Sequence, residues 1–297
     1  MVGIIIHGGC HDLDPTERER RLSHEGIIKY GDVGYRMLKE GAPSIDVVEK
    51  VLSLMEDDPI FDAGTGSFKN LNGIVEMDAI IMNHLENCGA VQCIQNVKNP
   101  IQVARAVMER TPHSILSGPG AEQFARLQGF PEYDPSITQQ DSAIEDAGDR
   151  KRMLRNIQYY IDEARKADHV FSTVGTVVLD SENHLVAATS TGGIRMKMPG
   201  RVGDSAIPGA GTYCNESIGL SATGEGEKII RLCLTYQAAQ DFLQTGNVTE
   251  SLRMNIGKAS RIDCISGIIA MTKDGEFSYA HNGAYMPVYH RLKKNRA

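Results

Sequence analysis

Two apolar strands joined by a short polar turn constrain this chain more than any other feature. The first strand covers residues 171–180 and is dense in β-branched and aliphatic side chains: Val174, Val177, Val178 and Leu179. A polar turn at residues 181–184 follows, and then a second apolar stretch at residues 185–193. This composition predicts a strand buried in a core, opened by the small hydroxyl residue Thr173.

Thr173 would gain a second chemical function if the chain were cut in front of it. The residue would then carry a free α-amine beside its hydroxyl, at the tip of a core strand. An α-amine has an ordinary pKa of about 7.7–8.0 and can accept the hydroxyl proton. Threonine is also a common strand former, so its position alone does not assign a catalytic role. The polar stretch at residues 131–167 predicts an exposed linker upstream, which suits cleavage.

The composition indicates a globular chain and argues against nucleic-acid binding. Of 297 residues, 41% are hydrophobic and 23% are charged, and the net charge is −7. The one basic cluster, at residues 150–155, is flanked by acidic residues, which indicates a solvated helix face. No apolar run approaches the roughly 18–20 residues that span a bilayer. We therefore expect a cytoplasmic protein without a nucleic-acid or membrane partner.

Six cysteines lie mostly in apolar segments and form no Cys-x-x-Cys pair. Buried free thiols of a reducing compartment are therefore expected, and disulfides or a zinc site are not. His7, Cys10 and His11 lie close together near the start of the chain. Because no further ligand follows nearby, we interpret them as part of a loop and not as a metal site.

Apolar spacing predicts helices and strands in both halves of the chain. The expected helices cover residues 15–41, interrupted at Gly31, then 44–56 with Ser44 as N-cap, 100–110, 121–127, one long helix at 228–243, and 248–256. The expected strands cover residues 2–6, 75–82 and 89–94, with a hairpin over 264–280. This order predicts the α+β class, and the length permits one large layered domain.

Segments rich in glycine and hydroxyl residues accompany these elements. They are His7-Gly8-Gly9, Gly64-Thr65-Gly66, and the stretches 188–193, 199–205, 208–213 and 221–227. Together they resemble the plant-type asparaginase and isoaspartyl peptidase family. Its members are N-terminal-nucleophile (Ntn) hydrolases, related to glycosylasparaginase and taspase. The similarity extends over nearly the whole chain.

The resemblance implies a four-layer αββα sandwich that forms one domain over residues 1–297. Self-cleavage would divide it into an α subunit ending at Ser172 and a β subunit beginning at Thr173. By resemblance, Thr173 is the nucleophile, Thr191 hydrogen-bonds it, and Thr223 and Gly224 donate to the oxyanion. The last two also precede a predicted helix, where backbone N–H groups favour negative charge.

Arg201 and Asp204 lie three residues apart, among glycines that let a ligand approach the backbone. A surface salt bridge is the default interpretation of such a pair. The alternative is an amino-acid clamp, in which the guanidinium binds an α-carboxylate and the carboxylate binds an α-ammonium. The resemblance favours the clamp, with Gly226 beside the substrate amine. The bond attacked would then be the β-amide of an isoaspartyl dipeptide or of asparagine.

Four residues depart from the family pattern. Asp62 stands where asparagine is usual in the substrate pocket. Its carboxylate is expected either to weaken binding of an acidic leaving product or to mark a different subfamily. Ser172 replaces the usual glycine or aspartate before the nucleophile, which bears on the rate of maturation. Cys10 and Ala206 also differ. These departures leave open an uncleaved, non-enzymatic binding protein. Residues 192–195 and 235–238 resemble glycosylasparaginase, which leaves open a hydrolase of N4-glycosylated asparagine.

The resemblance also implies an assembly and an ion. Members of the family usually form a dimer of αβ units, and a structural sodium ion held by backbone carbonyls is common near residues 55–65. No catalytic cofactor and no metal-ligating side chains are expected from the sequence. The expected partner is a small-molecule substrate, either a β-aspartyl dipeptide or asparagine.

Overall fold

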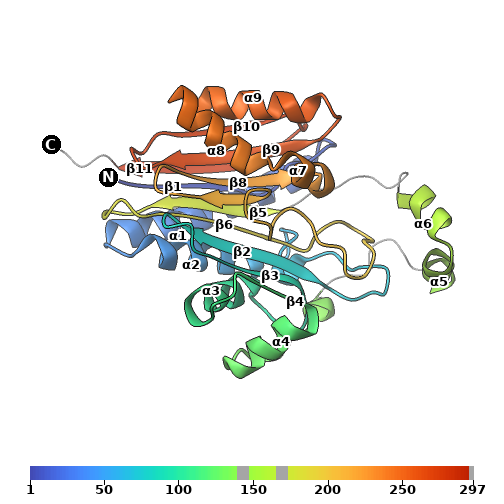
Figure 1. The fold of residues 1–297 in the computed structure, drawn as a ribbon. Helices are drawn as coiled ribbons and strands as arrows, with labels where there is room; N and C mark the ends of the chain where they lie inside the picture. Colours follow the sequence, from blue (N-terminus) through green and yellow to red (C-terminus); the bar gives the residue numbers. More distant parts are fainter. Residues whose placement is uncertain (139–146, 165–172, 294–297) are drawn as a thin grey trace.

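The computed structural model describes residues 1–138, 147–164 and 173–293. Ser172 lies outside the described residues, as do residues 139–146 and 165–167 of the predicted linker. Two sheets lie face to face, and helices cover their outer faces (Figure 1). The α+β class predicted from the sequence is confirmed.

The larger sheet has seven strands in the order β11-β1-β5-β6-β2-β3-β4. In that order they are β11 (Val288–Lys293), β1 (Val2–His7), β5 (Val174–Leu179), β6 (Leu185–Thr191), β2 (Met77–Asn83), β3 (Cys88–Ile94) and β4 (Ile115–Ser117). All neighbours are antiparallel except β3 and β4. The smaller sheet has the order β10 (Phe277–His281), β9 (Ser266–Thr272), β8 (Ile218–Gly224) and β7 (Thr212–Cys214).

Helices pack on the outer face of each sheet (Figure 1). Those on the larger sheet are α1 (Glu17–Lys39), α2 (Ser44–Glu56) and α3 (Pro100–Arg110), with α4 (Gly118–Leu127) beside β3 and β4. Those near the smaller sheet are α7 (Gly226–Leu232), α8 (Leu234–Thr245) and α9 (Val248–Ser260). Short helices η1 (Gly64–Gly66), η2 (Pro135–Thr138), α5 (Ala147–Arg155) and α6 (Ile157–Ala164) complete the described elements.

The two apolar strands predicted at residues 171–180 and 185–193 are confirmed as β5 and β6, which form a hairpin at the centre of the larger sheet. β5 and β6 pair antiparallel with Val174 opposite Ser190, and β1 and β2 flank them. Side chains that alternate along these strands enter two different apolar layers. Ile4 and Ile6 pack toward the helices, whereas Ile5 packs between the sheets. Both faces are covered, which explains why the strands are apolar throughout.

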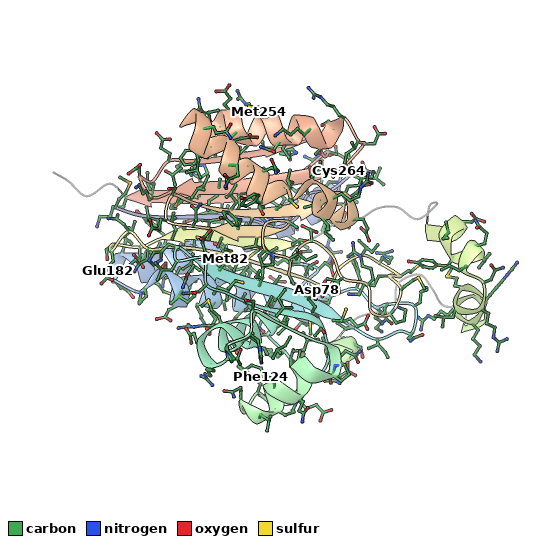
Figure 2. All side chains as sticks on the ribbon, viewed as in Figure 1. Asp78, Met82, Phe124, Glu182, Met254 and Cys264 are labelled. Carbon is green, nitrogen blue, oxygen red and sulfur yellow. The ribbon has the colours of Figure 1, made fainter. Side chains whose placement is uncertain are left out.

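Side chains fill the space between the layers, and Met82 of β2 belongs to the cluster between the sheets (Figure 2). This cluster joins strands of both sheets to α8 and α9; its buried members include Val177, Leu185, Leu220, Ile268, Leu234 and Leu252. The second cluster joins the larger sheet to α1, α2 and α3. The site described below lies at one end of the layer between the sheets.

Three local predictions are wrong, each for a tertiary reason. Helix α1 continues through Gly31, and the glycine there makes room for the ring of Tyr289, which would lie 2.3 Å from a Cβ at this position. The long helix expected at 228–243 is two helices, since Cys233 adopts a left-handed conformation with φ 46°. Pro43 and not Ser44 caps α2, and the Ser44 N–H donates to Asp180 Oδ2 at 2.9 Å.

Within the described ranges, no helix combines the length and the apolar character that a membrane span requires. All six cysteines are free thiols, and Cys233 is the exposed one.

The packing of the smaller sheet against its helices makes a first prediction. Gly219 and Ser221 of β8 face the larger sheet, so Leu220 between them points to the opposite face, which the helices cover. Leu220 is fully buried there, whereas Leu85 in the β2–β3 turn is 58% exposed. We expect Leu220→Ala to lower the free energy of unfolding by about 2–5 kcal/mol, because the cavity it leaves does not collapse fully. Leu85→Ala is the control and should change it by less than about 0.5 kcal/mol. Equal urea midpoints for the two variants would contradict this packing.

Candidate active site

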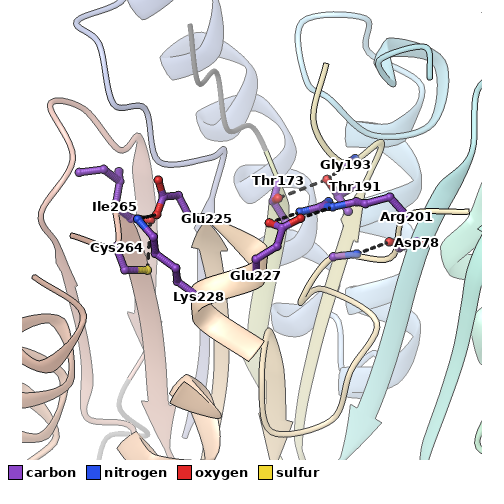
Figure 3. Close-up of polar contacts among 11 residues, drawn as sticks. Asp78, Thr173, Thr191, Gly193, Arg201, Glu225, Glu227, Lys228, Cys264 and Ile265 are labelled. Atoms are coloured by element: carbon purple, nitrogen blue, oxygen red, sulfur yellow. Dashed lines mark hydrogen bonds and ion pairs between the residues drawn. The ribbon is translucent and has the colours of Figure 1, made fainter. Parts of the chain in front are cut away.

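The β5–β6 pairing brings Thr173 beside Thr191. Thr173 directly precedes β5, and Thr191 is the last residue of β6. Because Val174 pairs with Ser190, the residues next to that pair face each other across the hairpin. The Thr173 hydroxyl donates to the Thr191 hydroxyl at 3.2 Å, and both side chains are buried (Figure 3). The structure thus brings together two of the predicted catalytic residues.

Thr191 also anchors the loop that follows it. Its hydroxyl oxygen accepts the Gly193 N–H at 2.9 Å. Asp62 reaches the same loop from the other side, because its backbone carbonyl accepts the Gly192 N–H at 2.9 Å. The hydroxyl next to Thr173 therefore has a defined position.

Thr223 and Gly224 end β8 in the smaller sheet, which packs against β5 and β6. The Thr223 hydroxyl accepts the Cys10 N–H at 3.1 Å, so its own hydrogen can be donated elsewhere. Gly224 has φ +134°, and a Cβ there would lie 2.2 Å from the Ile265 carbonyl oxygen. Only glycine suits that backbone conformation.

Arg201 and Asp204 lie near each other and near Gly226. A Cβ built on Gly226 would lie 2.8 Å from Arg201 Nη2 and 2.9 Å from Asp204 Oδ1. Any side chain at this position would fill the space between the two charged groups. In the part of the chain that the structure describes, Arg201 forms its ion pair with Glu227 and not with Asp204. The two charged groups of the predicted clamp thus lie close together but form no ion pair with each other.

Asp204 is poised to receive a cation. Its side chain is 4% exposed, and Oδ2 has no hydrogen-bond partner among the described residues. Burial raises the pKa of Asp204 to about 7, although the nearby Arg201 charge opposes the shift. A buried carboxylate in this condition gains most from a ligand that brings a positive charge and hydrogen-bond donors.

Asp62 braces the loop beside Thr191. Its Oδ1 accepts the Phe68 N–H at 2.8 Å, and burial raises its pKa to about 8. It also lines a cavity of about 460 Å³ together with His11, Phe68 and Arg195. The predicted substrate-pocket residue therefore lies at the wall of an actual cavity, next to the segment that holds Thr191.

Sequence analysis missed the residues that hold the Arg201–Asp204 loop. Asp78 on β2 accepts the Gly203 N–H at 3.1 Å through Oδ2 and the Cys93 N–H at 2.8 Å through Oδ1. Glu76 accepts the Gly200 N–H at 3.1–3.2 Å. The signal was present in the sequence as two acidic residues inside an otherwise apolar strand, which is a costly place for a charge without partners.

His7 lies behind Thr173 in a chain of buried polar groups. Its Nε2 is 2.9 Å from the Ser221 hydroxyl, which lies 2.7 Å from the Thr189 hydroxyl. Burial lowers the pKa of His7 to about 3, although a hydrogen bond with the Thr173 backbone opposes the shift. His7 is therefore neutral near pH 7 and supports the position of the Thr173 backbone. Within the described ranges, no three His, Cys, Asp or Glu side chains are placed to hold a metal ion.

The buried carboxylates predict how stability depends on pH. The pKa of Asp204 in the folded protein, about 7, exceeds its ordinary value of 3.8. Between these two pH values, the folded protein retains a proton on Asp204 that the unfolded protein has lost. The free energy of unfolding therefore falls as the pH rises from 3.8 to about 7. We expect Asp204→Asn to raise the free energy of unfolding by roughly 2 kcal/mol at pH 8 and to change it little at pH 4. A gain of equal size at both pH values would contradict the shift.

Comparison with known proteins identifies the family of the chain. A model of the family described as Asparaginase matches residues 1–296. The chain is 43% identical to a plant-type L-asparaginase of Pyrococcus furiosus, covering 96% of this chain and 95% of that protein. It is 39% and 38% identical to isoaspartyl peptidase/L-asparaginases of Bos taurus and Homo sapiens, covering 96% of this chain and 91% of each relative. The chain therefore belongs to the asparaginase family.

Proposed function

We propose that this chain is a hydrolase that cleaves isoaspartyl dipeptides and L-asparagine with Thr173 as its nucleophile. The observation that carries the proposal is the Thr173–Thr191 hydroxyl contact of 3.2 Å, together with Arg201 and Asp204, which lie close to each other and to Gly226. The family and the names of its relatives support the same activity. The αββα sandwich of the Ntn type is part of this proposal, supported by the two facing sheets with helices outside.

Maturation is the first step of the proposed chemistry. The Thr173 hydroxyl attacks the carbonyl carbon of Ser172, and the bond to the Thr173 nitrogen breaks to give an ester. Water then hydrolyses the ester. The products are an α subunit that ends in a Ser172 carboxylate and a β subunit that begins with the free amine and hydroxyl of Thr173.

Amide hydrolysis repeats this chemistry on a substrate. The free α-amine takes the hydroxyl proton as the oxygen attacks the β-carbonyl carbon of the aspartyl group. The Thr223 hydroxyl and the Gly224 N–H donate to the developing oxyanion. The leaving amine takes a proton as the C–N bond breaks, and water hydrolyses the acyl-enzyme to release aspartate. Arg201 and Asp204 hold the α-carboxylate and α-ammonium throughout, with Gly226 leaving room for them.

Replacing the nucleophile tests both steps. We expect Thr173→Ala to stay a single chain of 32.5 kDa on a denaturing gel and to lose amide hydrolysis by at least about 10³-fold, because no hydroxyl remains. Thr176→Ala is the matched control: it removes a buried hydroxyl of the same strand that donates to the Ile5 carbonyl, and it should still mature. A Thr173→Ala protein that still separates at residue 172 or hydrolyses amides would contradict the proposal.

Rates on three substrates with different leaving groups distinguish the proposed function from the two alternatives. Rates on β-aspartyl-leucine, asparagine and N4-glycosylated asparagine are measured on protein whose β-chain N-terminus has been sequenced. Turnover of the first two supports the proposal, whereas turnover of the glycosylated substrate alone indicates a glycosylasparaginase-like enzyme. Wild-type protein that remains one chain without turnover indicates the non-enzymatic binding protein.

A structural sodium ion is also proposed, in the loop between α2 and β2. The proposal is supported by main-chain oxygens that lie close to the loop glycines: a Cβ on Gly64 would lie 2.4 Å from the Glu56 carbonyl oxygen, and one on Gly66 would lie 1.9 Å from that of Phe61. Hard cations prefer such oxygen ligands. We expect sodium chloride to raise the thermal midpoint above that in N-methylglucamine chloride of equal ionic strength. Equal thermal midpoints in the two salts would contradict the proposed sodium site.

The expected assembly and location belong to the proposal as well. We propose a dimer of αβ units, as the family resemblance implies, and a cytoplasmic location, which the free cysteines support.

A further inference from the structure

We infer that Glu227 positions the Arg201 guanidinium so that one of its edges is kept for the substrate's α-carboxylate. Glu227 lies in the first turn of α7, directly after Gly226. The inference rests on the proposed function and extends it by a positioning residue for substrate binding.

Glu227 occupies one edge of the guanidinium. Arg201 Nε donates to Glu227 Oε1 at 2.8 Å, and Nη2 donates to Oε2 at 2.7 Å (Figure 3). This two-point contact fixes the plane and the rotation of the group. A guanidinium carries five N–H donors, so the edge formed by Nη1 and the second Nη2 hydrogen still has two donors for another carboxylate.

Glycines surround that second edge. Nη1 lies 2.8 Å from a Cβ position built on Gly203 and 3.4 Å from one built on Gly193, and Nη2 lies 2.8 Å from one built on Gly226. Side chains at these positions would fill the space that a ligand needs. Gly193 donates its N–H to Thr191, which in turn contacts Thr173. The second edge is therefore on the side of the nucleophile.

Glu227 also keeps Arg201 apart from Asp204. Asp204 is buried, close to Arg201, and has an oxygen without a partner among the described residues. Without Glu227, the guanidinium would be drawn to that oxygen, because opposite charges attract strongly where water is excluded. The two halves of the clamp would then neutralise each other, although each must bind a different substrate group.

The exposure of the pair makes Glu227 suitable for testing. The Glu227 side chain is 59% exposed, whereas that of Arg201 is 13% exposed. Ion pairs with so exposed a partner contribute little to folding stability. Changes at Glu227 should therefore act on substrate binding and leave the fold intact.

The experiment compares substrates with and without an α-carboxylate on matured enzyme. Asparagine carries the group, and 3-aminopropanamide is the same amide without it. We expect Glu227→Ala to raise KM for asparagine about tenfold with kcat within about threefold, and to leave kcat/KM for 3-aminopropanamide within about twofold. Glu227→Gln keeps one acceptor oxygen and should raise KM less. Glu250→Ala is the matched control, since Glu250 also lies in the first turn of a helix.

Binding of aspartate and of β-alanine to the same variants gives the same comparison without turnover. An asparagine KM within twofold of wild type in Glu227→Ala, or equal losses on both substrates and both ligands, would overturn the inference. Failure of wild-type enzyme to hydrolyse asparagine and isoaspartyl dipeptides would instead overturn the proposed function.

Discussion

The antiparallel pairing of β5 with β6 is the constraint on which the candidate site depends. It lies in the middle of a seven-stranded sheet whose faces are both covered, so its register cannot slip without exposing apolar side chains. That register places Thr173 within 3.2 Å of Thr191. The geometry of the nucleophile is therefore a consequence of core packing, and no flexible loop has to supply it.

Buried carboxylates hold the rest of the site in place. Asp78, Glu76 and Asp62 accept backbone N–H groups of the loops that carry Gly203, Gly200 and Phe68. A buried carboxylate is tolerated where such donors compensate its lost hydration. Asp78 on β2 and Glu76 beside it tie the loop of Gly200 and Gly203 to a strand. Asp62 instead holds its own loop together through Phe68.

The charges around Arg201 differ in how they are compensated. Arg201 is paired with Glu227, whereas Asp204 is buried with one oxygen lacking a partner among the described residues. The raised pKa of Asp204 is the cost of that arrangement, and a bound ammonium group would relieve it. Binding specificity for a zwitterion follows if one charge is pre-positioned and the other awaits its partner.

The sequence by itself determined the β5–β6 hairpin and the α+β class, because strand periodicity and turn residues are local signals. Its resemblance to a known family, and not periodicity, pointed to Thr173, Thr191, Arg201 and Asp204 as site residues. It did not determine why Gly31 lies inside α1, because the Tyr289 ring that leaves no room for a side chain there comes from the other end of the chain. It also did not determine that Cys233 adopts a left-handed conformation that separates α7 from α8. The tertiary structure alone decided that Arg201 pairs with Glu227, 26 residues away, and not with Asp204, three residues away. Spacing along a chain says which charges can meet, but direction and burial decide which of them do.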